Sequence, residues 1–182
     1  MTKVSDRLNR LAESATLAMA RMSRELQAKG IDVIALSLGE PDFDTPEFIK
    51  EAAKKAIDDN FSHYTPVPGL PELRSAIVQK FKRDNDLEFT PDQIVTSTGA
   101  KQSLANLCLS LLNAGDEVLL PCPYWVSYTE LVKLAEGVPV EVPSTIDSDF
   151  KVTPEQLEAA ITPKTKLLMF SSPCNPSGTV YT

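Results

Sequence analysis

The second half of the chain alternates between short runs rich in Val, Leu and Ile and segments with helical character, and this rhythm constrains the fold most. The expected strands are residues 94–98, 117–121, 138–143 and 166–172, and the expected helices between them are residues 99–113, 124–135 and 154–161. Hydrophobic strands alternating with helices are typical of βαβ units on a mainly parallel sheet. We therefore expect an α/β fold with a mainly parallel sheet and flanking helices.

The first half is less regular. A helix is expected over residues 14–29, closed by Gly30 in the position of a left-handed cap, and a short strand over residues 31–39. Thr45 and Pro46 have the cap and first-turn chemistry of a helix start, and Pro71 opens a further helix after a stiff, proline-rich loop. We expect residues 1–45 to form an N-terminal arm and segment, and residues 46–182 to belong to the α/β domain.

Composition excludes several classes of protein. Hydrophobic residues make up 42% of the 182 residues and charged residues 24%, as in ordinary soluble globular proteins. The net charge of −7 argues against nucleic acid or an anionic membrane as the main partner. No apolar run reaches the roughly 20 residues of a membrane helix, and the polar N-terminus does not read as a secretory signal. We expect a cytoplasmic protein.

The cysteines and the single histidine do not suggest a metal site. Cys108, Cys122 and Cys174 are widely spaced, form no CxxC pair and have no histidine nearby, and His63 is the one histidine. Zinc or Ser-His-Asp chemistry is therefore not expected. Cys108 lies in an apolar run typical of a core, whereas Cys174 either approaches a ligand or fills space in a loop.

Three unusual stretches follow expected strands, at residues 98–101, 122–125 and 172–176. Ligands of open α/β sheets bind beyond the carboxyl ends of the strands, so these stretches are expected to converge on one site. Gly99, Ala100 and Lys101 open a helix, where free backbone N–H groups and a nearby ammonium favour a phosphate or a carboxylate. The same residues also fit a plain strand-to-helix turn with a solvated lysine.

Other candidate residues have two interpretations as well. Trp125, the only tryptophan, either stacks on a flat ligand or anchors a helix to the sheet. Asn175 either donates a hydrogen bond to a ligand or serves an Asn-Pro turn. Tyr64, on the stiff loop, either reaches an anion or is half-buried, and Gly39 either allows close approach of a ligand or supplies a turn.

Five stretches together resemble one family. SLGEPDFDTP, HYTPVPGLPELRSAI, STGAKQSL, GDEVLLPCPYWVSY and SSPCNPSG occur in the order and spacing of class I aminotransferases, which are pyridoxal-phosphate enzymes of fold type I. The chain is most similar to the bacterial aspartate aminotransferase branch called Iβ. The resemblance extends from about Ser14 to Thr182.

The resemblance implies roles for individual residues. Gly99, Ala100 and Lys101 resemble the segment that binds the phosphate of pyridoxal 5'-phosphate. Trp125 resembles the residue that stacks on the pyridine ring, and Asn175 the asparagine that bonds its 3-hydroxyl oxygen. Tyr64 resembles a tyrosine that reaches the phosphate of the neighbouring subunit in a homodimer. The resemblance also implies contact with the amino acid or 2-oxo acid substrate for Gly39, Thr16, Lys101, Trp125 and Asn175.

The resemblance also indicates what to expect of activity. A lysine at position 101 is associated with the distal carboxylate of acidic substrates, which favours aspartate and glutamate, with prephenate and other aminotransferases of the branch as alternatives. Ala100 and Cys174 depart from the residues common in relatives, glycine and asparagine. The lysine that forms a Schiff base with the cofactor is expected downstream, and Lys164 and Lys166 are expected at the surface. We expect these 182 residues to be inactive alone; a non-catalytic binding protein of the same fold is a further alternative.

Overall fold

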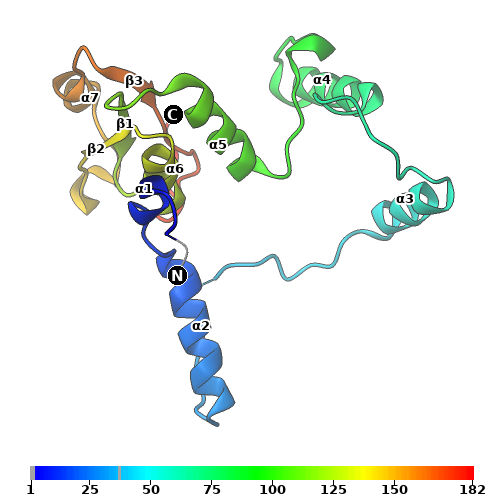
Figure 1. Cartoon of the computed structure of the whole chain (residues 1–182), viewed down its shortest axis with the longest axis horizontal. Helices are drawn as coiled ribbons and strands as arrows, with labels where there is room; N and C mark the ends of the chain where they lie inside the picture. The colour runs from blue at the N-terminus through cyan, green and yellow to red at the C-terminus, as the bar shows by residue number, and fades with distance from the viewer. Residues whose placement is uncertain (1–2, 37) are drawn as a thin grey trace. The chain divides into compact units, whose positions relative to one another are not determined.

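The computed structural model describes residues 3–36 and 38–182, and Figure 1 shows the order of its elements. The helices are α1 (Asp6–Asn9), α2 (Ala15–Ala28), α3 (Glu47–Asp58), α4 (Pro71–Asn85), α5 (Ala100–Leu111), α6 (Ser127–Leu134) and α7 (Pro154–Ala160), with 3-10 turns η1 (Pro91–Gln93) and η2 (Ile146–Ser148). The strands are β1 (Glu117–Pro121), β2 (Val138–Val142) and β3 (Thr165–Leu168). The chain divides into two compact units, Leu38–Thr98 and the combination of Met1–Ser37 with Gly99–Thr182.

The sheet lies in the second of these units, is parallel and has the order β2-β1-β3. In the register of the central strand, Glu117 pairs with Val138 on one side and with Thr165 on the other. All three strands had been predicted from their apolar sequences. The expectation of an α/β fold with a parallel sheet and flanking helices is therefore confirmed.

Helices cover both faces of the sheet because the side chains of β1 alternate between them. Val118 and Leu120, both fully buried, pack with Cys108 of α5 and Val132 of α6. Leu119 points to the other face, in a cluster whose partly buried members include Leu157 of α7. Each such side chain contributes roughly 1.5–3 kcal/mol through burial. The carboxyl end of β1 is thereby held rigidly between two layers, and the expectation that Cys108 is a core residue is confirmed.

The other unit is built on α3, α4 and η1. Arg74 of α4 is only 13% exposed in its side chain and donates from Nε to the carbonyl oxygens of Pro91 and Ile94, at 2.8 and 3.0 Å. Its guanidinium also pairs with Asp92 at 3.2 Å. One arginine thus joins the helix to the turn that follows it. The predicted start of this helix at Pro71 is confirmed.

Two predicted strands are wrong. Residues 31–36, 38–39 and 94–98 form no strand, and Ser37, which the first prediction included, lies outside the described residues. An extended segment becomes a strand only where a neighbour pairs with it. Ile34 and Leu36 are instead 84% and 91% exposed, and Thr96 forms a lone backbone bond to Pro68.

Smaller corrections concern the ends of elements. Helix α3 begins at Glu47 with Pro46 as its N-cap, one residue later than predicted, so Thr45 is not the cap. Strand β3 ends at Leu168, earlier than the predicted end at residue 172. Helix α2 ends at Ala28, one residue before the predicted end, and Gly30 lies in the left-handed region at a φ of 79°, as predicted for the cap.

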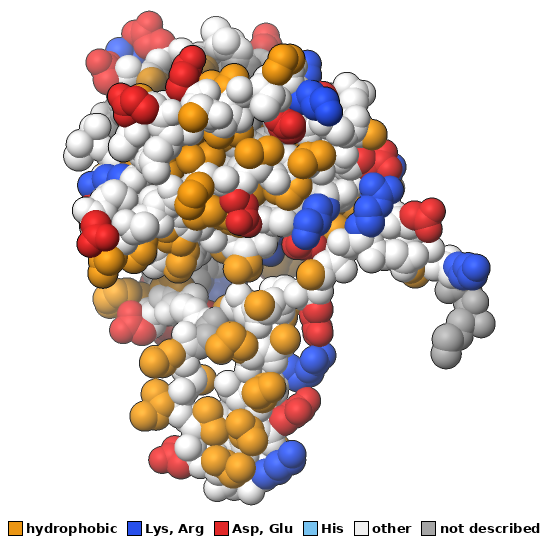
Figure 2. All heavy atoms as spheres, turned by 90° about the vertical axis from the view of Figure 1, so that its left-hand side faces the viewer, with side chains coloured by type: hydrophobic (Ala, Val, Ile, Leu, Met, Phe, Trp, Pro, Cys, Tyr) orange, Lys and Arg blue, Asp and Glu red, His pale blue; other side chains and the backbone are white. Residues whose placement is uncertain are grey.

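Large apolar side chains remain exposed on several elements. Figure 2 shows hydrophobic side chains gathered over the lower part of the molecule, where α2 lies. On this helix Leu17, Met19 and Met22 are each more than half exposed. Among the described residues, no helix has the length and apolarity that a membrane crossing requires.

Candidate functional site

The loop after β1 is fixed to the strand beside it. The N–H of Cys122 donates to the carbonyl oxygen of Val142 at 2.8 Å, which extends the pairing with β2 beyond the end of the strand. The hydroxyl of Ser144 donates to the carbonyl oxygen of Cys122. The backbone that leads into residues 123–126 therefore has a defined position at the carboxyl end of the sheet.

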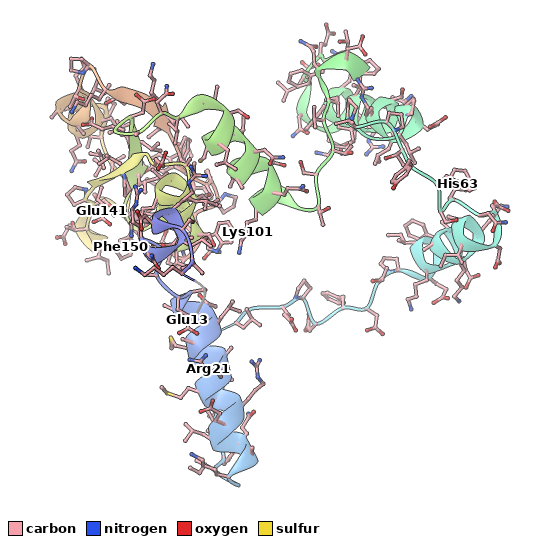
Figure 3. All side chains as sticks on the ribbon, in the orientation of Figure 1. Glu13, Arg21, His63, Lys101, Glu141 and Phe150 are labelled. Atoms are coloured by element: carbon pink, nitrogen blue, oxygen red, sulfur yellow. The ribbon has the colours of Figure 1, made fainter. Side chains whose placement is uncertain are left out.

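Trp125 stands at the end of this loop, immediately before α6. Its indole is partly buried against the main core cluster and meets the ring of Tyr128 edge-on, at 5.7 Å between centroids and 87° between planes. The ammonium nitrogen of Lys101 lies over the indole, 4.7 Å from its centroid. Figure 3 labels Lys101 at the start of α5. The structure thus brings together two of the predicted site residues, and Trp125 also has the helix-anchoring contact considered from sequence.

The N-terminus of α5 has the geometry of an anion cradle. Gly99 is its N-cap, at φ 81° and ψ 161°, a conformation that is essentially restricted to glycine. Glycine has no side chain with which to cap this end, and the first helical bonds are donated by Gln102 and Ser103 to the carbonyl oxygen of Gly99. The N–H groups of Gly99, Ala100 and Lys101 precede those bonds, where a helix offers donors and a positive dipole end to an anion.

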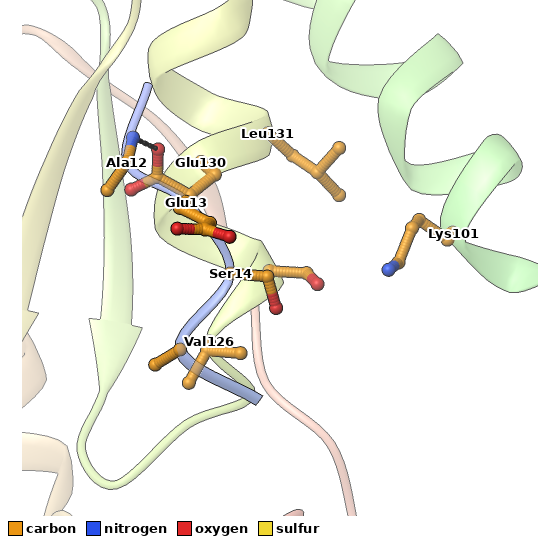
Figure 4. A pocket seen from close by; sticks show the side chains of 9 residues that line it. Ala12, Glu13, Ser14, Lys101, Val126, Glu130 and Leu131 are labelled. Carbon is orange, nitrogen blue, oxygen red and sulfur yellow. Dashed lines mark hydrogen bonds between the residues drawn. The ribbon is translucent and has the colours of Figure 1, made fainter. Parts of the chain in front are cut away.

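A cavity of about 360 Å³ lies beside Lys101, and the residues just before and at the start of α2 form part of its lining. Figure 4 shows the Lys101 ammonium directed toward this space and Ser14 on its other side. The lining residues are Ala12, Glu13, Ser14, Ala15, Lys101, Val126, Ser127, Glu130 and Leu131. The lining thus combines four apolar side chains with two hydroxyls, two carboxylates and one ammonium.

The two carboxylates of the cavity wall already have cationic partners. Glu13 pairs with Arg21 at 3.0 Å, and Glu130 pairs with Lys133 at 2.9 Å. Glu130 also accepts the backbone N–H of Ala12 at 2.8 Å, the dashed bond in Figure 4. Among the described residues, no carboxylate lies within 4.0 Å of the Lys101 ammonium. Among these residues, the face of the Trp125 indole is the group that the ammonium contacts.

Asn175 lies in the turn after β3 and is exposed. Its N–H donates to the Ser171 hydroxyl at 3.3 Å, and Gly178 closes the turn by donating to the carbonyl oxygen of Cys174 at 2.7 Å. The Cys174 thiol is 3.3 Å from the carbonyl oxygen of Pro123. This contact joins the turn that carries Asn175 to the loop that carries Trp125, so two of the three predicted strand-end stretches meet.

The other predicted site residues are not part of this constellation. Thr16 lies in the first turn of α2, next to the cavity residue Ala15, but does not line the cavity. Gly39 and Tyr64 belong to the unit Leu38–Thr98. Tyr64 is fully exposed, so it is not half-buried, and it lines an open depression of about 430 Å³ with Ala56, Asp59, Asn60, Phe61, His63, Thr65 and Leu70. Lys164 and Lys166 are exposed, as predicted.

Sequence reasoning missed several residues of the cavity wall. Ser14 had been used only as the first residue of a helix, although a hydroxyl at a helix start commonly faces a polar partner. Glu130 was not singled out, and its bond to Ala12 spans 118 positions, which no local pattern indicates. Tyr124, which does not line this cavity, was not singled out either, yet its hydroxyl donates to Glu141 at 2.6 Å.

These residues fit a phosphorylated pyridine. The uncapped start of α5 suits a phosphate, and a Cβ built on Gly99 would meet no atom within 4 Å, so there is room above this backbone. The indole of Trp125 offers a flat face to a ring, because the group that covers it is the end of a flexible lysine. No cluster of three possible metal ligands occurs in the part of the chain that the structure describes.

Comparison with known proteins agrees with this geometry. Residues 31–182 match the family model described as aminotransferase class I and II. The chain is 54% identical over its whole length to an aspartate/prephenate aminotransferase from Cereibacter sphaeroides and covers 46% of that protein. It is 50% identical to an aspartate aminotransferase from Bacillus sp., with 98% of the chain and 46% of the relative covered.

Solved structures give the same result. An aspartate aminotransferase from Thermus thermophilus with maleate superposes with a TM-score of 0.96 at 46% identity, covering the whole chain and 48% of the known structure. An alanine aminotransferase from Pyrococcus furiosus superposes with a TM-score of 0.93 at 38% identity, covering 99% and 46%. The chain spans about half the length of the relatives it matches, and it belongs to the class I and II aminotransferase family.

Proposed function

We propose that this chain supplies the cofactor-holding part of a pyridoxal-phosphate-dependent aminotransferase that moves an amino group between aspartate or glutamate and a 2-oxo acid. One observation carries the proposal: Lys101 lies over Trp125 beside the uncapped start of α5. Anion-binding backbone, an aromatic face and a cation are thereby combined in one unit. Pyridoxal phosphate, when bound, supplies the electron sink for the pair left by the substrate's α-proton.

The roles proposed for the residues follow from their chemistry. Gly99, Ala100 and Lys101 hold the phosphate through backbone N–H groups and one positive charge. Trp125 stacks on the ring, and Asn175 donates to the oxygen of its 3-hydroxyl group. Tyr64 of a second copy completes the phosphate site in a homodimer, which accords with a fully exposed phenol on a proline-rich loop.

The proposed substrates are dicarboxylic. Lys101 points into the cavity without a carboxylate partner among the described residues, so it is available to a distal carboxylate of the substrate. Gly39, Thr16, Trp125 and Asn175 complete the proposed substrate side. Prephenate is a second candidate because it also carries two carboxylates and appears in the name of the relative from Cereibacter sphaeroides.

Three broader proposals concern the intact enzyme. Residues 1–45 form its arm and a small-domain segment, and residues 46–182 form part of its large domain. The enzyme acts as a homodimer in the cytoplasm. The covalent attachment of the cofactor uses a lysine outside residues 1–182, because Lys101 serves the phosphate and substrate, and Lys164 and Lys166 lie exposed just before and within β3.

Titration with pyridoxamine 5'-phosphate tests the proposal, because this form of the cofactor cannot form an imine with lysine. Trp125 is the only tryptophan, so its fluorescence reports on the site directly. We expect saturable quenching, and weaker binding of pyridoxamine, which lacks the phosphate. Equal affinity for both compounds, or no saturation, would contradict the proposed cradle.

Borohydride reduction in the presence of pyridoxal phosphate tests the position of the attachment site. We expect mass spectrometry to find no lysine of residues 1–182 modified at one equivalent per chain. A single lysine labelled stoichiometrically would overturn that part of the proposal. Binding of pyridoxamine phosphate by a full-length enzyme without transaminase activity would favour a non-catalytic binding protein instead.

A further inference from the structure

The aromatic residues around the strand end form a cluster centred on Tyr128. Tyr128 is only 6% exposed and packs in the main core. The indole of Trp125 meets it edge-on, and the phenol of Tyr124 lies nearly parallel to it, at 6.5 Å between centroids and 16° between planes. The orientation of Trp125 is therefore coupled by packing to the rings of Tyr128 and Tyr124.

The Tyr124 phenol is held at its far end by two hydrogen bonds. Its hydroxyl donates to a carboxylate oxygen of Glu141 at 2.6 Å and accepts a bond from the Thr129 hydroxyl at 2.7 Å. Glu141 lies on β2 and Thr129 lies on α6. A charged acceptor and a short distance make the first bond the stronger of the two.

The backbone of the loop that leads to Trp125 is held by several contacts, so the conformations of its side chains are what can still vary. Cys122 is bonded to Val142 and Ser144, and the carbonyl oxygen of Pro123 contacts the Cys174 thiol. With the backbone tethered, the direction of the indole is decided by rotation of its own side chain. That rotation is limited by Tyr128 on one side and by the Lys101 ammonium at 4.7 Å.

We propose that Tyr124 and Glu141 are positioning residues for Trp125, acting through Tyr128 to hold the indole ready to stack on the cofactor ring. The consequence for cofactor binding rests on the proposed function, whereas the positioning itself does not. Thr129 supports the same phenol from the α6 side. A prearranged indole loses less side-chain freedom on binding, so affinity depends on residues that never touch the ligand.

The emission of Trp125 tests the positioning without cofactor. In Tyr124→Phe the ring stays and both hydroxyl bonds are lost, and we expect lower anisotropy and stronger acrylamide quenching. Glu141→Ala is expected to change both signals in the same direction. The double variant is expected to show no more change than Tyr124→Phe alone, because that substitution already removes the bond between Tyr124 and Glu141. Glu141→Gln keeps an acceptor oxygen and is expected to restore most of the native signal.

Tyr181→Phe is the matched control. Its hydroxyl also accepts a hydrogen bond, from the N–H of Val152 at 3.0 Å, but it belongs to the cluster on the other face of the sheet. We expect it to leave the anisotropy and quenching of Trp125 unchanged. If Tyr124→Phe fails to fold, Glu141→Ala decides the question, since Glu141 is exposed.

Two outcomes overturn the proposal: native Trp125 signals in both Tyr124→Phe and Glu141→Ala, or an equal change in Tyr181→Phe. Titration with pyridoxamine 5'-phosphate then separates this inference from the proposed function. If the native chain binds, we expect Tyr124→Phe to bind about threefold to tenfold more weakly, the loss that corresponds to one hydrogen bond. If the native chain does not bind, the proposed function fails while the emission measurements still decide the positioning.

Discussion

Gly99 shows how one residue can serve both backbone geometry and binding. Its φ of 81° and ψ of 161° lie in a region that side chains avoid, although a Cβ would have open space around it. We expect Gly99→Ala to lower the free energy of unfolding by about 1–3 kcal/mol through backbone strain alone. Urea denaturation measures this change.

Gly39 provides the control for that substitution. A Cβ there also meets no atom within 4 Å, but its φ is not in the left-handed region. Gly39→Ala is expected to change the free energy of unfolding by less than about 0.5 kcal/mol, as surface substitutions usually do. Equal losses in the two variants would show that the conformation of Gly99 is not the cause.

Lys101 is the residue on which substrate choice should depend. Lys101→Met keeps most of the length of the side chain and removes its charge, so a C4 dicarboxylate loses a charged partner in the cavity. We expect the affinity of the chain for the C4 dicarboxylate, measured by calorimetry in the presence of pyridoxamine 5'-phosphate, to fall about tenfold or more. Lys151→Met is a matched control for net charge, because Lys151 pairs with Asp149 away from the cavity. A similar loss in both variants would assign the effect to overall charge.

At the scale of elements, the central strand carries most of the packing. Leu120 of β1 is fully buried in the main core, whereas Leu168 of β3 is 46% exposed. We expect Leu120→Ala to lower the free energy of unfolding by about 2–5 kcal/mol, because a cavity is left behind. Leu168→Ala, the same change on an edge strand, is expected to lower it by less than about 1 kcal/mol. Urea denaturation of both variants tests the difference, and similar losses would contradict the central position of β1.

Elements were predictable from sequence where local pattern and pairing agree. Residues 117–121 are apolar and enter the sheet between two partners, so the sequence pattern and the structure coincide. Residues 94–98 are also rich in residue types that favour strands, but they gain no partner strand. Strand propensity describes how well a side chain suits a sheet surface, not whether a neighbour exists. The second requirement cannot be read from the segment itself.

In the candidate site, too, some features could be predicted from the sequence and others could not. Gly99 and Trp125 were found because a helix start and a lone tryptophan are visible in the sequence. The contact of Lys101 with the indole and the bond from Tyr124 to Glu141 depend on rotamers and on the register of β1 against β2. Such contacts join residues 17 or more positions apart, so no local pattern specifies them.

At the scale of the whole molecule, alkaline pH should destabilise the fold in an ordered way. Burial raises the pKa of the Cys108 and Cys122 thiols. Burial is also the main cause that raises the pKa of the Tyr124 phenol, and its hydrogen bond to Glu141 is the second. As the pH rises, the unfolded chain therefore loses these protons at a lower pH than the folded chain. Between the unfolded and the folded pKa values the folded chain binds more protons, so the free energy of unfolding falls as the pH rises. We expect the free energy of unfolding to be unaffected by these groups at neutral pH, to fall above about pH 8.5 as the thiols titrate, and to fall further above about pH 10.

Urea denaturation between pH 7 and the alkaline limit measures this dependence, and two variants separate the groups. Tyr124→Phe should flatten the upper part of the curve and leave the lower part intact. Cys122→Ala should reduce the slope of the lower part, where the buried Cys108 thiol still titrates, and leave the upper part intact, since it removes a thiol whose pKa is raised by burial and by the Glu141 carboxylate. A free energy of unfolding that rises with pH through this window would contradict the assigned directions. If instead Tyr124→Phe left the upper slope unchanged, the phenol would be exposed in the folded chain, and its bond to Glu141 could not hold the ring beside Trp125.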